Sequence, residues 1–127
     1  MELKKILVID SEIHMLNFLG VILGNRYDLS MQSGSVEAMQ WLHKGNMPDI
    51  IISEINMPYM SGSELISNLK ISGLYRHIPI IVLSGIKDLS TQISAIPFKV
   101  DAYFSKPFNP LDLEMAMSNI LASHAVN

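Results

Sequence analysis

Cysteine is absent from this chain of 127 residues, and so is any excess of positive charge. Without cysteine there is no disulfide framework, no thiol nucleophile and no thiolate metal site. Nine Lys and Arg stand against twelve Asp and Glu, which gives a formal net charge of -3. Because nucleic-acid binding depends on a basic face that contacts phosphates, we expect no nucleic-acid binding by this domain.

Long hydrophobic runs are also missing. The N-terminal stretch, M-E-L-K-K-I-L-V-I-D, has only a short apolar run, far shorter than the core of a signal peptide. Nothing approaches the roughly eighteen apolar residues of a membrane span. We therefore expect no membrane association and a cytoplasmic location, which the lack of cysteine also fits. The length suits a single domain, residues 1–127, with a core of its own.

Short apolar runs alternate with helical patterns along the whole chain. Strands are predicted at residues 6–9, 27–31, 49–54, 78–83 and 102–105, and helices through residues 15–22, 36–42, 61–70, 89–96 and 110–121. Strands that recur every 20 to 30 residues with helices between them indicate a parallel sheet covered on both faces. Right-handed crossovers make this an α/β doubly wound fold.

Local signals add detail to the helices. The buried stripe of the first helix is predicted to be Met15, Phe18, Leu19 and Ile22. Asp88 is predicted to cap a weak fourth helix, which Pro97 cuts short. Asn109 and Pro110 supply a cap residue followed by proline at the first helical position, which predicts a strong start for the last helix.

Four of the predicted strands end on a polar side chain. The run Ile50 to Glu54 is apolar until it reaches a single carboxylate, and the other strand ends carry Asp10, Ser84 and Lys106. The carboxyl ends of parallel strands meet at one edge of the sheet, where ligands bind in open α/β folds. We therefore expect these four residues to converge in one pocket.

The residues around these strand ends carry a family resemblance. The segments are I-L-V-I-D-S-E, P-D-I-I-I-S-E-I-N-M-P-Y-M-S-G, I-P-I-I-V-L-S-G and D-A-Y-F-S-K-P-F, in that order. Over essentially its whole length the chain resembles a response-regulator receiver domain of the CheY-like superfamily. The resemblance implies a flavodoxin-like, doubly wound, five-stranded parallel sheet of order 2-1-3-4-5 with five helices. It also implies a two-component signal transduction module that is not an enzyme.

The resemblance also implies roles for single residues. Glu54 occupies the position of the phosphoaccepting aspartate, and Lys106 that of the lysine that pairs with the phosphoryl group. Ser84 matches the switch hydroxyl and Tyr103 the aromatic side chain whose rotamer follows activation. The bond between Lys106 and Pro107 matches one that is usually cis in the family.

The acidic pocket departs from the family pattern. Asp10 matches the first acid of a pair, Ser11 replaces the second acid, which is a metal ligand, and Glu12 follows as the first residue of a helix. Three carboxylates and one ammonium would give a charge near -2, whereas Asp10 and Glu54 with Lys106 give -1.

Magnesium binding is accordingly expected to be weak or absent. The candidate ligands are Asp10, Glu54 and the backbone carbonyl of Asn56. Mg²⁺ requires near-ideal octahedral oxygen coordination, and this set lacks one hard oxygen ligand.

Glu54 is the second departure. Its extra methylene moves the carboxylate by about an ångström. Because phosphoryl transfer depends on positioning, a shift of that size lowers the reaction rate on the order of a hundredfold. One hypothesis is that Glu54 reaches Lys106 and forms a standing ion pair where a phosphoryl oxygen would otherwise lie. The alternative is that Glu54 is a relic that points to solvent.

Three functions follow from these alternatives. The first is an atypical receiver that acts by protein–protein interaction without aspartate phosphorylation. The second is a receiver that a histidine kinase still phosphorylates, on Glu54 or on Ser53. The third is a flavin-binding protein, which the acidic loop D-S-E-I-H-M disfavours because a flavin phosphate needs hydroxyls and free amides.

The expected protein partners are a histidine kinase, an effector domain or a dimer mate. The resemblance places the contact surface in the region Lys87–Ala122. Leu111 and Met115 are candidates for exposed apolar contacts on the outer side of the last helix, or alternatively pack locally.

Overall fold

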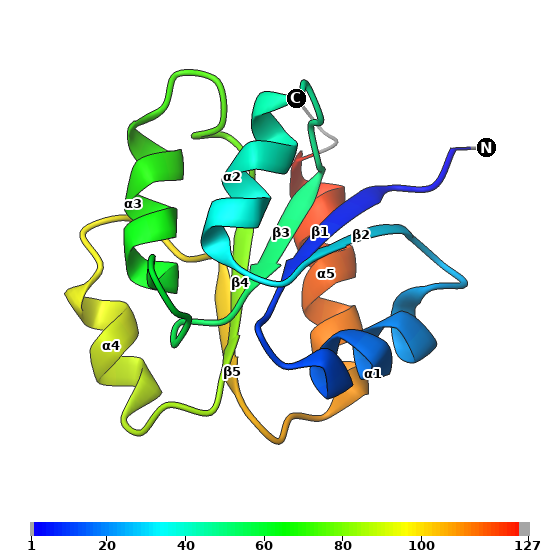
Figure 1. The fold of residues 1–127 in the computed structure, drawn as a ribbon. Helices are drawn as coiled ribbons and strands as arrows, with labels where there is room; N and C mark the ends of the chain where they lie inside the picture. The colour runs from blue at the N-terminus through cyan, green and yellow to red at the C-terminus, as the bar shows by residue number, and fades with distance from the viewer. Residues whose placement is uncertain (1, 125–127) are drawn as a thin grey trace.

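A five-stranded parallel sheet forms the middle layer of the protein (Figure 1). The structure is a computed structural model and describes residues 2–124. The strands are β1 (Lys5–Ile9), β2 (Asp28–Gln32), β3 (Ile50–Ser53), β4 (Ile80–Ser84) and β5 (Ala102–Ser105). Their order is β2-β1-β3-β4-β5, so the predicted flavodoxin-like architecture is confirmed.

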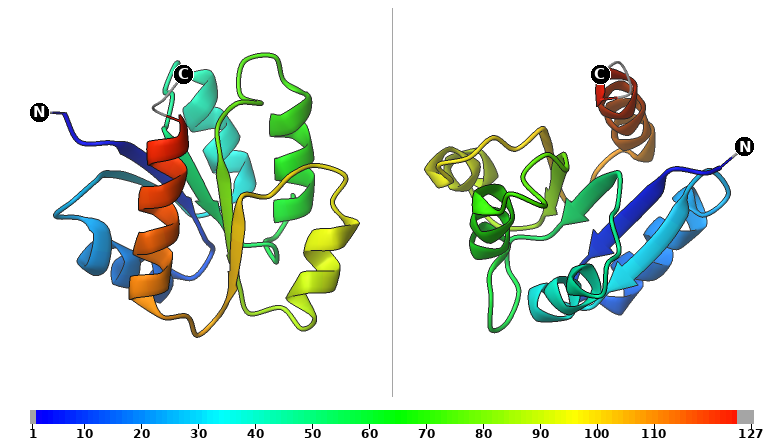
Figure 2. Two further views of the ribbon diagram at one scale, coloured as in Figure 1. Left: turned by 180° about the vertical axis from the view of Figure 1, so that it is seen from behind. Right: turned by 90° about the horizontal axis from the view of Figure 1, so that it is seen from above.

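Helices cover both faces of this sheet (Figure 2). They are α1 (Ile13–Leu23), α2 (Ser35–His43), α3 (Gly62–Ile71), α4 (Leu89–Ala95) and α5 (Pro110–His124). Helices α1 and α5 pack on one face, and α2, α3 and α4 pack on the other. Within residues 2–124, no helix combines the length and the apolar character needed to cross a membrane.

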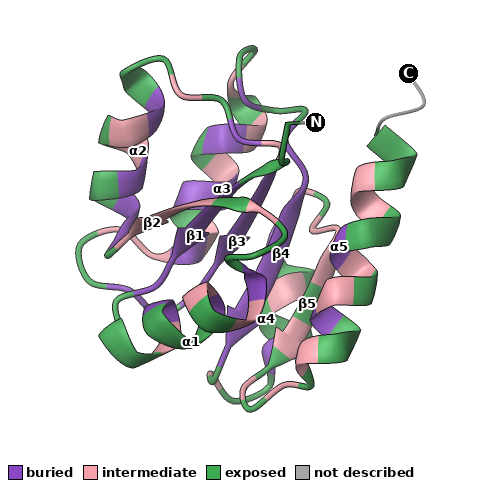
Figure 3. Ribbon diagram, turned by 90° about the vertical axis from the view of Figure 1, so that its right-hand side faces the viewer, coloured by how far each residue is buried: buried purple, intermediate pink, exposed green. Residues whose placement is uncertain are grey.

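The central strands are buried on both sides, which explains their continuous apolar runs. In β1, Ile6 and Val8 point to the side of α1 and α5, whereas Leu7 and Ile9 point to the side of α2 and α3. Figure 3 shows β1, β3 and β4 as buried strands. The edge strands β2 and β5 are more exposed.

The buried face of α1 agrees with the prediction in part, since Leu19 is buried and Met15 and Ile22 pack against the same core. Leu16, Leu19 and Leu23 are buried, whereas the ring of Phe18 is 41% exposed. Apolar residues lie almost all around this helix, so the spacing alone fits two neighbouring stripes. Phe18 instead packs edge to face against Phe108 from the segment before α5, with 6.1 Å between the ring centroids.

The boundaries of the last two helices test the local signals. Helix α4 ends at Ala95, before Pro97, as predicted. The predicted cap by Asp88 is wrong, because this residue has a left-handed backbone with φ 53 and its side chain makes no capping hydrogen bond. The predicted start of α5 is confirmed, since Asn109 Oδ1 accepts a hydrogen bond from the Leu111 amide at 2.9 Å.

Candidate functional site

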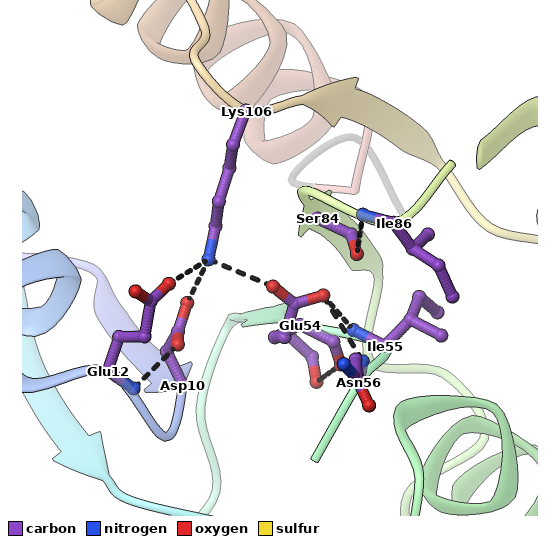
Figure 4. Close-up of polar contacts among 9 residues, drawn as sticks. Asp10, Glu12, Glu54, Ile55, Asn56, Ser84, Ile86 and Lys106 are labelled. Carbon is purple, nitrogen blue, oxygen red and sulfur yellow. Dashed lines mark hydrogen bonds and ion pairs between the residues drawn. The ribbon is translucent and has the colours of Figure 1, made fainter. Parts of the chain in front are cut away.

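The four polar residues predicted at the strand ends do converge (Figure 4). Asp10 and Glu54 directly follow the paired strands β1 and β3, and Ser84 ends β4. Lys106 directly follows β5, whose last residue is paired with Ser84. The parallel register therefore brings side chains from four distant segments to one edge of the sheet.

The ammonium group of Lys106 occupies the centre of this site. Its Nζ lies 2.6 Å from Asp10 Oδ2 and 2.9 Å from Glu54 Oε1. A third carboxylate, on the exposed side chain of Glu12, lies 3.5 Å away. The side chain of Lys106 is only 11% exposed, so this ammonium bridges two buried acids rather than projecting into solvent. The hypothesised ion pair between Glu54 and Lys106 is present.

The second oxygen of the Glu54 carboxylate is bound by the loop that follows it. Glu54 Oε2 accepts hydrogen bonds from the backbone amides of Ile55, at 2.7 Å, and Asn56, at 3.2 Å. Glu54 is 7% exposed, so the alternative in which it points to solvent is wrong. Both carboxylate oxygens therefore have partners within the protein.

These contacts keep Glu54 and Lys106 charged. Burial raises the pKa of the Glu54 carboxyl, but the Ser84 hydroxyl, Lys106 and the two backbone amides outweigh it and hold this pKa below the ordinary value of 4.5. Burial likewise lowers the pKa of Lys106, but the carboxylates of Asp10 and Glu54 outweigh it and raise this pKa above 10.5. At neutral pH the site is an ion pair and not a neutral hydrogen bond.

The backbone of Glu54 is fixed by a close approach of helix α3. A Cβ atom on Gly62 would collide with the backbone carbonyl oxygen of Glu54, so only glycine fits there. The Gly62 amide also donates to the Ile55 carbonyl at 2.8 Å. The preceding residue, Ser61, forms a capping box with Glu64 that starts α3. The contact between Gly62 and the Glu54 backbone could not be predicted from the sequence. The one signal for it there is a glycine at the start of a helix.

The remaining predicted pocket residues lie at the rim. Ser11 and Asn56 are exposed and line the same hollow as Asp10 and Glu54. Glu12 precedes the first turn of α1, where its side chain makes no cap, but its backbone amide donates to Asp10 Oδ1 at 2.9 Å.

Three predicted residues, Ser84, Tyr103 and Ser53, do not line this hollow. Ser84 is 0% exposed, and its hydroxyl oxygen accepts a hydrogen bond from the Ile86 amide at 3.2 Å. Tyr103 is on β5 and is 44% exposed. Ser53 is 1% exposed, and its hydroxyl donates to the backbone carbonyl of Glu54 at 2.9 Å. The Lys106–Pro107 bond is cis, as the resemblance implied.

Metal binding can be tested against the donors that are present. The oxygens of Asp10 already accept from Lys106 and from the Glu12 amide, and those of Glu54 from Lys106 and two amides. Ser11 offers no carboxylate at the rim, and the third carboxylate near the site, that of Glu12, lies 3.5 Å from Lys106 Nζ. Across residues 2–124, no group of three or more His, Asp or Glu side chains is arranged to hold a metal. This donor set does not fit Mg²⁺, which needs six well-placed oxygens.

Comparison with known families agrees with this geometry. Residues 6–118 match the family described as the response regulator receiver domain. The chain belongs to this family. Receiver domains are non-catalytic signalling modules that interact with histidine kinases and effectors, so the family assignment favours signalling over flavin binding.

The sequence relatives are longer signalling proteins, and this chain matches a part of each. The chain is 30% identical over 120 residues to Histidine kinase P4 of Formosa agariphila, which covers 94% of this chain and 9% of the kinase. It is 27% identical over 96 residues to Response regulator Rre1 of Synechocystis, which covers 76% of this chain and 41% of that protein. The chain thus spans less than half of each of these relatives. In the kinase, the matching segment is only a small part of the protein.

Solved structures share the whole fold. A response regulator receiver domain protein from Clostridium thermocellum superposes with a TM-score of 0.86 at 28% identity, covering 98% of both chains. The signal receiver domain of an HD domain-containing protein from Pseudomonas fluorescens gives a TM-score of 0.89 at 26% identity, covering 99% of this chain and 100% of that one.

Replacing Glu54 by Gln is expected to make the free energy of unfolding less dependent on pH in the acid range. Because the pKa of Glu54 lies below 4.5 in the folded protein, its charged form stabilises the fold above that pH. This contribution disappears as the pH falls through the folded-state pKa. Urea unfolding between about pH 7 and about pH 3 should therefore show a smaller loss of unfolding free energy in Glu54→Gln than in the wild type.

Glu37→Gln is the matched control, because Glu37 is exposed in the first turn of α2, away from the site. It should keep the pH dependence of the wild type. If Glu54→Gln and Glu37→Gln lose unfolding free energy equally steeply as the pH falls, the result would contradict an ion pair at Glu54.

Proposed function

We propose that this domain is an atypical receiver with a preset switch, which acts by protein–protein interaction without the usual aspartate phosphorylation. The observation that carries the proposal is the position of the Lys106 ammonium, between Asp10 and Glu54. In this arrangement the Glu54 carboxylate supplies the negative charge that a phosphoryl group would bring to Lys106. We treat residues 1–127 as one such unit.

Phosphoryl transfer to Glu54 is disfavoured by three features of the site. Both oxygens of its carboxylate are already bound, so a nucleophilic oxygen must first leave a partner. Ser11 removes a ligand for the metal that would neutralise the developing charge. The longer side chain also misplaces the carboxylate, and such a displacement lowers the rate of phosphoryl transfer on the order of a hundredfold.

Phosphorylation of Ser53 is the weaker alternative. The side chain is on β3, buried to 1% exposure, and its hydroxyl already donates to a backbone carbonyl. A phosphodonor would have to open the sheet to reach it. Glu54 therefore remains the alternative acceptor that experiment must exclude.

The region Lys87–Ala122 is proposed as the surface for a histidine kinase, an effector domain or a dimer mate. Three apolar or aromatic side chains on β5 and α5 support this choice. Tyr103 is 44% exposed, Leu111 60% and Met115 57%. Leu111 and Met115 lie four residues apart on α5, and exposed apolar side chains that are close together favour a protein contact.

Incubation with acetyl phosphate and Mg²⁺ should leave the mass of the wild-type protein unchanged. The double variant Ser11→Asp, Glu54→Asp is the matched control. It restores the second acid and shortens the acceptor, so it should gain the mass of one phosphoryl group. Intact-protein mass spectrometry distinguishes these outcomes, and peptide mapping locates any added group.

A phosphoryl group on wild-type Glu54 or Ser53 would overturn the proposal. Failure of the double variant to react while it keeps the native circular dichroism spectrum would show that the two substitutions do not account for the loss of reactivity.

Substitution of Met115 by Ser should weaken binding to a kinase or effector fragment by about tenfold, because an apolar contact at the centre of an interface is lost. Val21→Ser is the control, since Val21 is 79% exposed on α1. Isothermal titration with the partner fragment measures both. If Met115→Ser binds the partner as tightly as the wild type and Val21→Ser binds it more weakly, the contact surface lies on α1 and not in the proposed region.

A further inference from the structure

A second polar pocket lies at the amino ends of β4 and β5, at the opposite end of these strands from the Glu54–Lys106 site. Its volume is about 560 Å³. Its walls come from the end of α3, the loop before β4, the loop before β5 and the end of α5. The left-hand view of Figure 2 shows these segments at one end of the molecule.

The pocket gathers positive charge in an acidic protein. Lys70, Arg76 and Lys99 line it, which is three of the nine Lys and Arg in a chain of net charge -3. The carboxylate that lines it within residues 2–124 is Asp101. Three cations and one carboxylate leave a charge near +2, and His77 adds to it when protonated.

Asp101 is already engaged by the protein. Its Oδ1 accepts a hydrogen bond from the Ile80 amide at 2.9 Å, which joins the starts of β4 and β5. Its Oδ2 lies 3.8 Å from Lys99 Nζ, whose side chain is 82% exposed. This carboxylate therefore makes a strand contact, and within residues 2–124 Lys99 is the one cation within 4.0 Å of it.

Lys70 is the most confined of these cations. Its Nζ donates to the backbone carbonyls of Arg76, at 3.3 Å, and Ile78, at 3.1 Å. In residues 2–124 no carboxylate oxygen lies within 4.0 Å of this ammonium. Burial lowers the pKa of Lys70, Asp101 raises it and Lys99 lowers it further, with a net decrease. A bound anion would supply the negative charge that this lysine lacks.

One wall of the pocket is apolar. Phe98 is half-buried and Pro79 is buried, and both line the same space as the three cations. The volume is within the range of small-molecule sites, which combine apolar walls with a few converging polar groups. A ligand that suits both parts has a doubly charged head and a flat apolar portion.

We propose that this pocket binds a small phosphate monoester, with the phosphate between Lys70, Arg76 and Lys99 and the apolar portion against Phe98. The charge near +2 matches a dianion. Side chains from three separate segments can contact different oxygens of a tetrahedral group. The site is independent of any chemistry at Glu54.

The test is a titration of the ¹⁵N-labelled protein with phenyl phosphate and with inorganic phosphate at constant ionic strength. Both should give saturable amide shifts in residues 98–101 and 76–77, and phenyl phosphate should bind on the order of tenfold more tightly because its ring is buried. Phenol, which lacks the charge, should give no saturable shift.

Lys99→Gln and Arg76→Gln should each weaken phenyl phosphate binding about tenfold, because each removes a charged hydrogen-bond donor. Both side chains are exposed, so the fold should be retained, which the dispersion of the amide spectrum verifies. Lys4→Gln is the control, since Lys4 is exposed and outside the pocket. Linear shifts without saturation, or equal weakening in Lys4→Gln and Lys99→Gln, would overturn the proposal.

Discussion

The position of one ammonium group governs the functional edge of this domain. Lys106 Nζ pairs with two carboxylates, those of Asp10 and Glu54, and both residues are nearly buried. A buried carboxylate without a partner is costly, and removing one member of a buried pair leaves an uncompensated charge. The remaining oxygens are satisfied by backbone amides, so the arrangement is complete without a ligand. The proposal of a preset switch rests on this completeness.

The fold supplies the precision that this arrangement needs. Parallel strands β1, β3 and β5 deliver the three charged residues to one edge, and the contact of Gly62 with the Glu54 carbonyl fixes the loop below the carboxylate. The Glu54 carboxylate then lies 2.9 Å from Lys106 Nζ. In the proposed function, the residues at positions 11 and 54 adapt a family geometry for an exchangeable phosphoryl group to a permanent internal charge pair.

Much of the fold and the convergence of the site could be predicted because each depends on local signals. Buried parallel strands are continuous apolar runs, and their carboxyl ends must share an edge. The exposure of Phe18 on α1 could not be predicted, since Leu16 and Phe18 lie on equally apolar stripes and packing against Phe108 decides between them. The basic pocket was also missed, because Lys70 and Lys99 come from segments with no common pattern. Glu54 itself left two alternatives, and only the tertiary distance to Lys106 separates them.

The most direct measurement of the central claim is the titration of the Glu54 carboxyl carbon by ¹³C NMR in the wild type and in Lys106→Met. If the ammonium holds this carboxylate in its charged form, the midpoint lies below 4.5 in the wild type and moves upward in the variant. The same midpoint in both proteins would show that Lys106 does not hold the charge of Glu54, and would contradict the preset switch.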